Sequence, residues 1–392
     1  MNPKAEAELD RRTRLDQVKR LVVKVGSSSL TTGENQLDLQ VMQNLVEDVA
    51  ELRRQGREVA IVSSGAVAAG MGQLGLTDRP QAIGDLQAVA AVGQVRLMAT
   101  YQQLFSRQNL SLGQVLLTAE DILESRRRYV NLERTFSRLF SYGAVPVINE
   151  NDSVAVAELK RTIGENDALA AYVANLVQAQ LLVVLSDVEG LYTEYGDGGP
   201  NGELIRYVHY GDTEMEKAAA PAKSRQGSGG MTTKLRAAKL LMVCGEMSII
   251  AHARRHRLVD IMAGDELGTL FVPPAKRLQS RKRWIAFAAP AKGCVVVDRG
   301  AQEAIATQGK SLLPVGVVGC RGHFDSGEVV RVENEGRTEL ARGLANYSSQ
   351  ELDRIAGRSL AQVEGILNRP SREVIHRDDL VLFDGEAPTR AP

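Results

Sequence analysis

The sequence has few cysteines and no excess of charge of either sign. Its 392 residues include three cysteines, Cys244, Cys294 and Cys320, an odd number without a C-x-x-C pair. This argues against a disulfide framework and against a thiolate zinc site, so we expect reduced, mostly buried thiols. The 48 basic residues equal the 48 acidic ones. The net charge of the chain therefore does not attract it to nucleic acid or to an anionic membrane, and any function that depends on charge must rest on a local group of residues.

Long apolar runs are also missing. The longest, around residues 181–185, has the length of a strand, whereas a membrane helix needs about 18 apolar residues. The N-terminal segment carries charges of both signs and no apolar stretch, which is unlike a secretory signal. We therefore expect a cytoplasmic protein. The length exceeds the roughly 100–200 residues of a typical domain, so two domains are expected.

What the sequence does contain is an alternation of short apolar runs with helical patterns. From Asp38 to Gly56, for example, apolar residues recur at three- and four-residue spacing, which predicts a helix. The alternation indicates an α/β fold, a three-layer αβα sandwich around a mainly parallel, doubly wound sheet. In such a sheet, ligands bind beyond the carboxyl ends of the strands. The strands are predicted at 21–26, 59–62, 114–117, 145–148 and 181–185, and further helices around 132–142, 168–178 and 234–243.

The character of the sequence changes near Pro273 and Pro274, which precede a basic stretch at 276–283. We interpret that stretch as a solvated linker rather than as an RNA contact. A boundary at about 280 then separates a domain at 15–280 from a small β-rich domain at 285–385. The second domain is predicted to contain strands at 293–297, 315–319, 328–332 and 339–346 and a helix at 349–356.

Lys24 lies inside the first apolar strand, where an unpaired ammonium group would be costly to bury. It must therefore meet an anion, and the backbone N–H groups and hydroxyls of 26–29 can turn toward the same anion, as phosphate-binding loops do. The alternative is a lysine that extends from the strand end into solvent.

A second glycine-lysine segment is GSGGMTTK at 227–234, which precedes a helical pattern. The N-terminus of that helix would face a phosphate, although the Gly-Lys-Ser/Thr adjacency of a Walker A loop is missing. Two lysines after glycine-rich backbone suggest one cation for each end of a transferring phosphoryl group. Taken alone, the segment is also compatible with a flexible loop.

Acidic and amide side chains cluster at 149–153 and 164–168, where Asp152, Asn166 and Asp167 could hold an ammonium group, a metal or the lysines themselves. The alternative for each block is a helix N-cap. Ser64 and Gly65 open a helix of small residues, which suits a close approach of backbone to a carboxylate or, alternatively, tight helix packing.

Two further patterns are discounted. Residues 70–75 match G-x-G-x-x-G but follow a helical pattern rather than a strand, unlike a dinucleotide-binding loop. His252 and His256 are four residues apart, but the glutamate of H-E-x-x-H is missing, which argues against a metal site.

Together these segments resemble the amino acid kinase family. The motifs VVKVGSSSL, VSSGAVAAG, AVAAVGQVRL, VPVINENDSVA, GENDALAA, VVLSDVEGLYT and GSGGMTTKLRAA occur in the family's order. The resemblance is closest to members that phosphorylate the γ-carboxylate of L-glutamate and carry a C-terminal PUA module, because the junction RKRW and the segments YSSQELDRIAG and VIHRDDLVL match as well. It runs from about residue 20 to 383 and implies the amino acid kinase fold followed by a small PUA barrel.

The resemblance also implies an activity and a site. The enzyme would use ATP and Mg²⁺ to form γ-glutamyl 5-phosphate, the first step of proline biosynthesis. The implied catalytic residues are Lys24, Lys234 and Asp167, of which Asp167 orients the two lysines. The implied glutamate ligands are Ser64, Asp152 and Asn166. No protein metal site is implied, since Mg²⁺ arrives with ATP. The nucleotide side would comprise Lys24, Ser186, Asp187, Ser228, Gly229, Gly230, Met231, Thr232, Thr233 and Lys234.

The implied partners are L-glutamate, ATP, proline as a feedback inhibitor, and further copies of the chain in a homo-oligomer. Functional coupling to glutamate-5-semialdehyde dehydrogenase is also implied, and neither a membrane nor nucleic acid is expected. One departure concerns Glu165, which stands where the family usually has aspartate, after a segment that looks slightly longer. The affinity for glutamate can therefore differ.

Three alternatives stay open. A related amino acid kinase would phosphorylate aspartate, N-acetylglutamate or a nucleotide instead. A protein of another class would bind RNA through the PUA module, but residues 285–392 contain 13 Lys and Arg against 15 Asp and Glu, a net charge of −2. That balance disfavours contact with phosphate backbones. The module can also serve a structural or regulatory purpose.

Overall fold

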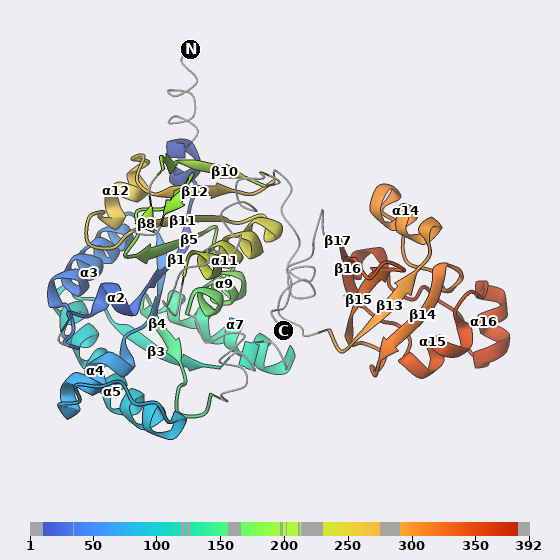
Figure 1. Ribbon diagram of the computed structural model, residues 1–392, viewed down its shortest axis with the longest axis horizontal. Helices are drawn as coiled ribbons and strands as arrows, with labels where there is room; N and C mark the ends of the chain where they lie inside the picture. The colour runs from blue at the N-terminus through green and yellow to red at the C-terminus, as the bar shows by residue number, and fades with distance from the viewer. Residues whose placement is uncertain are drawn as a thin grey trace, which may run out of the picture. The chain divides into compact units, whose positions relative to one another are not determined.

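The chain forms two compact units, Met1–Arg277 and Leu278–Pro392, coloured along the chain in Figure 1. The computed structural model describes residues 11–33, 35–118, 121–122, 126–155, 166–196, 199–200, 202–210, 212, 230–274 and 291–382. The predicted boundary at about 280 lies outside these residues, as do 383–392. The domain limits 15–280 and 285–385 therefore stay predictions.

The first unit is built on an eight-stranded sheet in the order β10-β12-β11-β5-β1-β2-β4-β3. All neighbouring strands are parallel except β11 and β12, which confirms the mainly parallel α/β sheet. Two short ribbons, β6 with β9 and β7 with β8, lie outside it. The strands are β1 Arg20–Val25, β2 Glu58–Ser63, β3 Leu112–Leu117, β4 Val145–Glu150, β5 Leu181–Ser186, β6 Leu191–Tyr192, β7 Tyr195–Gly196, β8 Gly199–Pro200, β9 Leu204–Ile205, β10 Tyr207–His209, β11 Met247–His252 and β12 Thr269–Val272.

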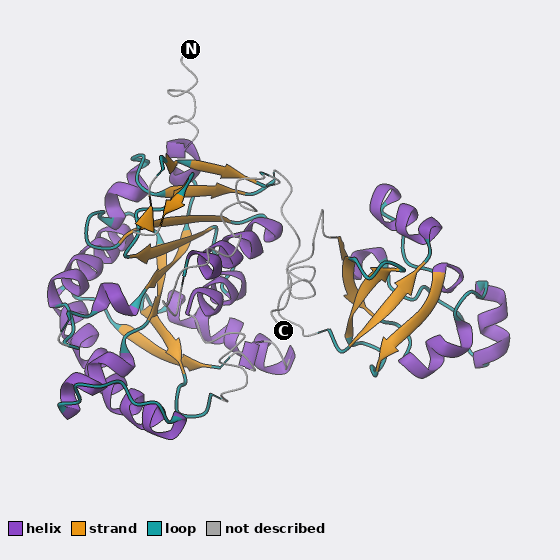
Figure 2. Ribbon diagram, viewed as in Figure 1, coloured by secondary structure: helices purple, strands orange, loops and turns teal. Residues whose placement is uncertain are grey.

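Helices cover both faces of this sheet (Figure 2). One layer holds α3 (Leu39–Arg54), α5 (Ile83–Arg107) and α12 (Leu258–Ala263), and the other holds α7 (Arg126–Ser141), α9 (Asn166–Leu176) and α11 (Met231–Cys244). Leu21, Val23 and Val25 belong to the core cluster on the α3 side. Because successive strand side chains point to opposite faces, Lys24 points toward α9 and α11. No helix within the described ranges is long and apolar enough to cross a membrane.

Between β2 and β3 the chain forms two helices, of which the first is the small-residue helix expected after Ser64 and Gly65. The first, α4 (Ala66–Leu74), ends at Gly75, whose backbone is left-handed at φ +67°, and α5 then begins anew. A Cβ at Gly70 would lie 2.0 Å from the carbonyl oxygen of Val89 on α5. Gly70, the first glycine of the G-x-G-x-x-G pattern, therefore permits close packing of α4 against α5.

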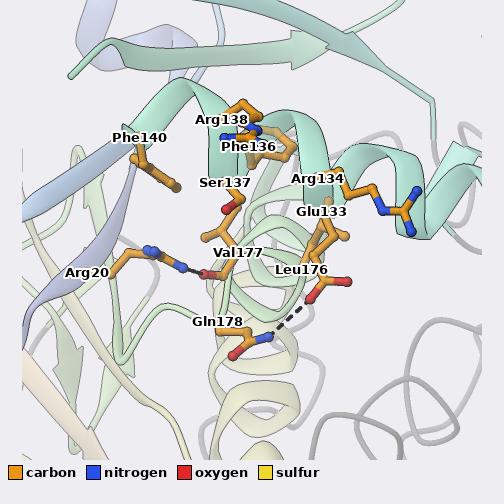
Figure 3. A pocket seen from close by; sticks show the side chains of 10 residues that line it. All are labelled: Arg20, Glu133, Arg134, Phe136, Ser137, Arg138, Phe140, Leu176, Val177 and Gln178. Atoms are coloured by element: carbon orange, nitrogen blue, oxygen red, sulfur yellow. Dashed lines mark hydrogen bonds between the residues drawn. The ribbon is translucent and has the colours of Figure 1, made fainter. Parts of the chain in front are cut away.

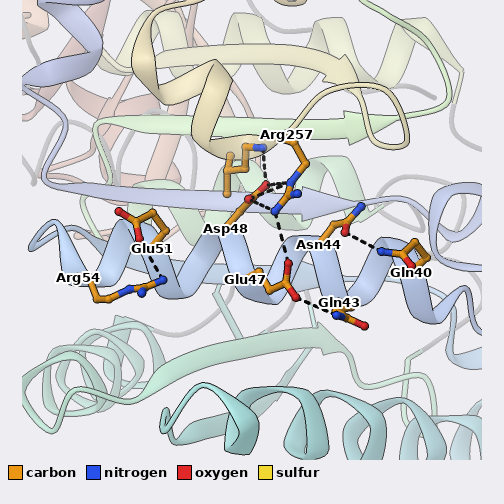
Figure 4. A network of polar contacts seen from close by, with 9 residues as sticks. Gln40, Gln43, Asn44, Glu47, Asp48, Glu51, Arg54 and Arg257 are labelled. Carbon is orange, nitrogen blue, oxygen red and sulfur yellow. Dashed lines mark hydrogen bonds and ion pairs between the residues drawn. The ribbon is translucent and has the colours of Figure 1, made fainter.

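A buried carboxylate connects α3 to α12 (Figure 4). Asp48 on α3 accepts hydrogen bonds from Arg257 Nη2 at 2.6 Å and from the backbone N–H of Leu258, the first residue of α12, at 2.7 Å. Arg257 also lies 3.7 Å from Glu47, which is partly exposed. Asp48 thus satisfies a helix N-terminus that has no side-chain cap of its own.

The second unit contains a five-stranded sheet in the order β14-β13-β15-β16-β17. The predicted strand at 315–319 is wrong in its limits, because Pro314–Gly316 forms a 3-10 turn and the strand follows it at Val317–Gly322. Proline favours the first turn of a helix, where its missing N–H is not needed. The strands are β13 Gly293–Val297, β14 Val317–Gly322, β15 Val329–Asn334, β16 Glu339–Leu344 and β17 Leu380–Leu382, and the helices are α14 Arg299–Gln308, α15 Ser349–Ile355 and α16 Leu360–Leu367.

Candidate active site

A carboxylate and two lysines meet at the carboxyl end of β1. Asp167, in the first turn of α9, lies with Oδ1 2.6 Å from Lys24 Nζ and with Oδ2 3.8 Å from Lys234 Nζ. The side chains of Lys24 and Lys234 are 9% and 7% exposed, and that of Asp167 is 1% exposed. Lys24 is therefore not a lysine that extends into solvent. Two ammonium groups thus meet at this strand end, where they can interact with a further anion.

Thr233 links the same carboxylate to the start of α11. Its Oγ1 donates a hydrogen bond to Asp167 Oδ2 at 2.9 Å. Gly230 precedes the helix, whose first turn holds Met231, Thr232 and Thr233. The N–H groups of such a turn and the positive end of the helix favour an anion. Ser228 and Gly229 lie outside the described residues.

Ser186 is the last residue of β5 and Asp187 follows it, at the same edge of the sheet. Ser186 is buried and donates a hydrogen bond to Asp187 Oδ1 at 2.9 Å. Burial opposes ionisation of Asp187, but hydrogen bonds from Ser186, its own N–H and Ser28, together with nearby Lys234, lower its pKa. The carboxyl ends of β1 and β5 and the start of α11 thus form one polar surface.

The predicted glutamate ligands Ser64 and Asn166 are in direct contact. Asn166 Nδ2 donates to Ser64 Oγ at 2.5 Å, to the carbonyl oxygen of Ser63 at 3.1 Å and to Asn149 Oδ1 at 3.3 Å. Asp152 lies in the turn that directly follows β4 and is half-buried. Because β2 and β4 are parallel neighbours, their carboxyl ends place these groups at one edge of the sheet.

The N-cap alternative does not describe Asn166 and Asp167. Both residues open α9, but their side chains contact Ser64 on one side and Lys24 on the other. They connect the two lysines to the cluster of Ser64, Asn149 and Asn166, which we call the acceptor side. Glu165, the departure from the family pattern, lies outside the described residues.

Sequence reasoning gave no individual role to three residues of this region. Asn149 lies in the acidic-and-amide cluster predicted at 149–153, and the signal for it was an amide directly after the apolar run at 145–148. Gln94 accepts a hydrogen bond from Asn149 Nδ2 at 2.8 Å, although it lies 55 positions away. Arg254, which follows β11, donates to the carbonyl oxygens of Thr31 at 3.0 Å and Ser28 at 3.4 Å and pairs with Asp38. It holds the short helix α2 (Ser27–Leu30), and no local pattern predicts it.

Histidines and carboxylates do not assemble a metal site in the part of the chain that the structure describes, where no group of three or more possible ligands occurs. His252 and His256 lie with ring centroids 6.5 Å apart. Their Nδ1 atoms accept hydrogen bonds from the backbone N–H groups of Arg254 and His252, at 3.1 and 3.3 Å. Burial lowers the pKa of each ring, and the positive charge of nearby Arg255 lowers both values further.

A hollow of about 510 Å³ lies at the opposite end of β1 (Figure 3). Three of its polar side chains are already paired. Arg20 pairs with Glu58 at 2.6 Å and donates to the carbonyl oxygen of Val177, and Gln178 donates to Glu133 at 3.1 Å. Arg20 begins β1, whereas Lys24 is near its end. The hollow is thus separate from the lysine cluster.

Comparison with known proteins gives matches over both units. Residues 19–251 match the amino acid kinase family and residues 293–367 match the PUA domain. A glutamate 5-kinase of Citrifermentans bemidjiense is 47% identical over 375 residues, which cover 95% of this chain and 100% of the relative. One from Geobacter sulfurreducens is 45% identical over 371 residues, covering 94% and 99%. A structure of carbamate kinase from Giardia lamblia bound to AMP-PNP covers 66% of this chain and 99% of its own, with 15% identity and a TM-score of 0.46.

Proposed function

The chain belongs to the amino acid kinase family and, within it, to the glutamate 5-kinases, and we propose from this that it transfers the terminal phosphoryl group of ATP to the γ-carboxylate of L-glutamate. The observation that carries the proposal is the cluster of Lys24, Asp167 and Lys234. Its two buried ammonium groups suit a reaction between two anions.

The chemistry requires charge neutralisation rather than a base. A γ-carboxylate is already ionised at neutral pH, so no proton has to be removed. One of its oxygens forms a bond to the terminal phosphorus while the bond from that phosphorus to the β–γ bridging oxygen breaks, which releases ADP. Lys24 and Lys234 would stabilise the phosphoryl oxygens, and Asp167 would hold the two ammonium groups in place.

The two sides of the cluster would hold the two substrates. On the acceptor side, Ser64, Asn166 and Asp152 would bind glutamate through hydroxyl, amide and carboxylate groups. On the other side, Ser186, Asp187 and the segment 228–234 would bind the nucleotide. Because Asn166 and Asp167 are adjacent, glutamate would lie next to the carboxylate that holds both lysines.

Mg²⁺ would arrive with ATP. Asp167 is already engaged, since Oδ1 meets Lys24 and Oδ2 accepts from Thr233, so it suits lysine binding better than metal binding. Mg²⁺ is usually bound through substrate phosphates and keeps several waters. When bound, it supplies further positive charge at the phosphoryl oxygens.

The proposal is tested by trapping the acyl phosphate with hydroxylamine in the presence of ATP and Mg²⁺, with L-glutamate, aspartate, N-acetylglutamate or UMP as acceptor. We expect hydroxamate from glutamate and a decrease in turnover of roughly 10²–10³ in Lys24→Ala and Lys234→Ala, the scale for losing a preorganised donor. Lys19→Ala and Lys239→Ala are matched controls just before β1 and on α11. Near-normal turnover in both site variants would contradict the assignment, and activity with another acceptor alone would change the substrate.

We further propose that proline inhibits the enzyme by competing with glutamate, that the chain acts as a cytoplasmic homo-oligomer, and that the product passes to glutamate-5-semialdehyde dehydrogenase as the first step of proline synthesis. The family membership supports each of these. Proline should raise the apparent KM for glutamate without changing that for ATP. Inhibition that glutamate does not relieve would argue against a shared site.

We also propose that residues 15–280 and 285–385 are separable domains. The two compact units and the two family matches support this division. A chain that ends at residue 280 should then fold and retain kinase activity with altered regulation. A truncated protein without a cooperative thermal transition would show that the boundary is wrong.

A further inference from the structure

A series of side-chain amides connects helix α5 to the acceptor side. Gln94 Oε1 accepts from Asn149 Nδ2 at 2.8 Å, Asn149 Oδ1 accepts from Asn166 Nδ2 at 3.3 Å, and Asn166 Nδ2 donates to Ser64 Oγ at 2.5 Å. Asn149 and Ser64 are buried. The series thus begins at a residue with no role in the function proposed above.

These contacts fix which end of each amide points where. Asn166 Nδ2 faces three acceptors, the carbonyl oxygen of Ser63, Ser64 Oγ and Asn149 Oδ1. Asn149 Oδ1 also accepts the N–H of Glu150 at 2.9 Å. If Asn149 were reversed, its NH₂ group would face two donors. Because Gln94 Oε1 accepts from Asn149 Nδ2, it favours the observed orientation.

Gln94 is itself held in place by close helix packing. A Cβ at the neighbouring Gly93 would lie 1.8 Å from the carbonyl oxygen of Ala66 and 2.3 Å from the backbone nitrogen of Gly70, both on α4. Since α4 begins two residues after Ser64, this contact between α4 and α5 sets the position of Gln94 relative to Ser64. Such close backbone approach leaves little freedom for either helix to slide.

We propose that Gln94 is a positioning residue that sets the polarity of the acceptor side. By orienting Asn149, Gln94 keeps Asn166 Nδ2 hydrogen-bonded to acceptors of the protein. Asn166 Oδ1 is then left to accept a hydrogen bond from a substrate ammonium group. Ser64 Oγ accepts from Asn166 and therefore keeps its own hydrogen for a substrate carboxylate. The inference rests on the proposed function, and it adds the means by which an α-amino acid is distinguished from a simple dicarboxylate.

Gln94 acts through its oxygen. Its Nε2 atom is buried and has no hydrogen-bond partner among the described residues. A buried atom of this kind does not reach a ligand unless the helix moves. Gln94→Glu retains an acceptor for Asn149, whereas Gln94→Leu removes it and leaves a buried donor unpaired, which is unfavourable.

The test compares wild type, Gln94→Leu, Gln94→Glu and the control Gln102→Leu, an exposed position of the same helix. The readouts are the KM for L-glutamate, the KM for ATP, kcat, and the inhibition constant of glutarate, which lacks the ammonium group. We expect Gln94→Leu to raise the KM for glutamate roughly ten- to hundredfold, with kcat, the KM for ATP and glutarate inhibition within about threefold of wild type. Gln94→Glu and Gln102→Leu should stay within about threefold throughout.

If Gln94→Leu weakened the binding of glutamate and of glutarate equally, the inference would be overturned, because a loosened pocket affects both ligands. An unchanged KM for glutamate in Gln94→Leu would overturn it as well. So would an increase in the KM for glutamate that is as large in Gln94→Glu as in Gln94→Leu. Failure of the proposed function is distinguishable, since it would appear as absence of hydroxamate from glutamate in the wild-type enzyme.

Discussion

Replacing Asp167 with asparagine removes the negative charge that lies between Lys24 and Lys234 while keeping the size of the side chain. Removing one partner of a buried ion pair costs about 3–5 kcal/mol, because the remaining charge is left uncompensated. Here two ammonium groups, on side chains 9% and 7% exposed, lose the same carboxylate. We therefore expect Asp167→Asn to lower the free energy of unfolding by roughly 4 kcal/mol. At about 2–4 °C per kcal/mol for a unit of this size, Tm should fall by roughly 10 °C.

The same substitution should lower kcat by roughly 10²–10³, because the lysines repel each other once the carboxylate is gone and no longer hold one geometry. Mg²⁺ and ATP should then raise Tm more in the variant than in the wild type, since the phosphates supply the missing negative charge. Thermal unfolding with and without the nucleotide measures this, alongside hydroxamate formation. Asp78→Asn, an exposed aspartate of the same unit, is the matched control. Wild-type values of kcat and Tm in Asp167→Asn would refute the reasoning.

Two further predictions concern stability. Asp48→Ala should lower the free energy of unfolding by about 2 kcal/mol, because it leaves the buried N–H of Leu258 without its acceptor and removes the buried partner of Arg257. Glu47→Ala, which removes a partly exposed partner of the same arginine, should change it by less than about 1 kcal/mol. Equal effects in denaturant titrations would contradict this. In the folded chain the pKa values of His252 and His256 are lowered from the ordinary histidine value of 6.5. At a pH near 6.5 the unfolded chain therefore binds more protons than the folded chain. The free energy of unfolding should therefore fall as pH drops through 6.5 and below, and a variant with Asn at both positions should lose less between pH 7.5 and 5.5.

The local pattern of the sequence was sufficient for the strands that carry the site. An apolar run interrupted by Lys24 required an anion, because burying an ammonium group is costly, and the structure supplies Asp167. The order of motifs along the chain identified the family, and the parallel sheet then predicted that segments after β1, β2, β4 and β5 would share one edge. None of this needed contact information, since periodicity and the ends of strands are local properties.

Long-range packing decided what the pattern left open. The contact of Arg254 with α2 joins elements that lie far apart in the sequence. The strand order of β10, β11 and β12 likewise depends on pairing between strands and not on a local pattern. The partnership of Gln94 with Asn149 is of the same kind, because a polar residue on an amphipathic helix looks alike whether it faces solvent or a buried amide.

The sequence by itself thus determined the fold class, the family and the residues that bear the chemistry, because burial patterns and motif spacing are encoded along the chain. Only the tertiary structure decided which groups touch. A hydrogen bond or an ion pair depends on the positions of two side chains to within tenths of an ångström, and those positions follow from how helices pack on the sheet.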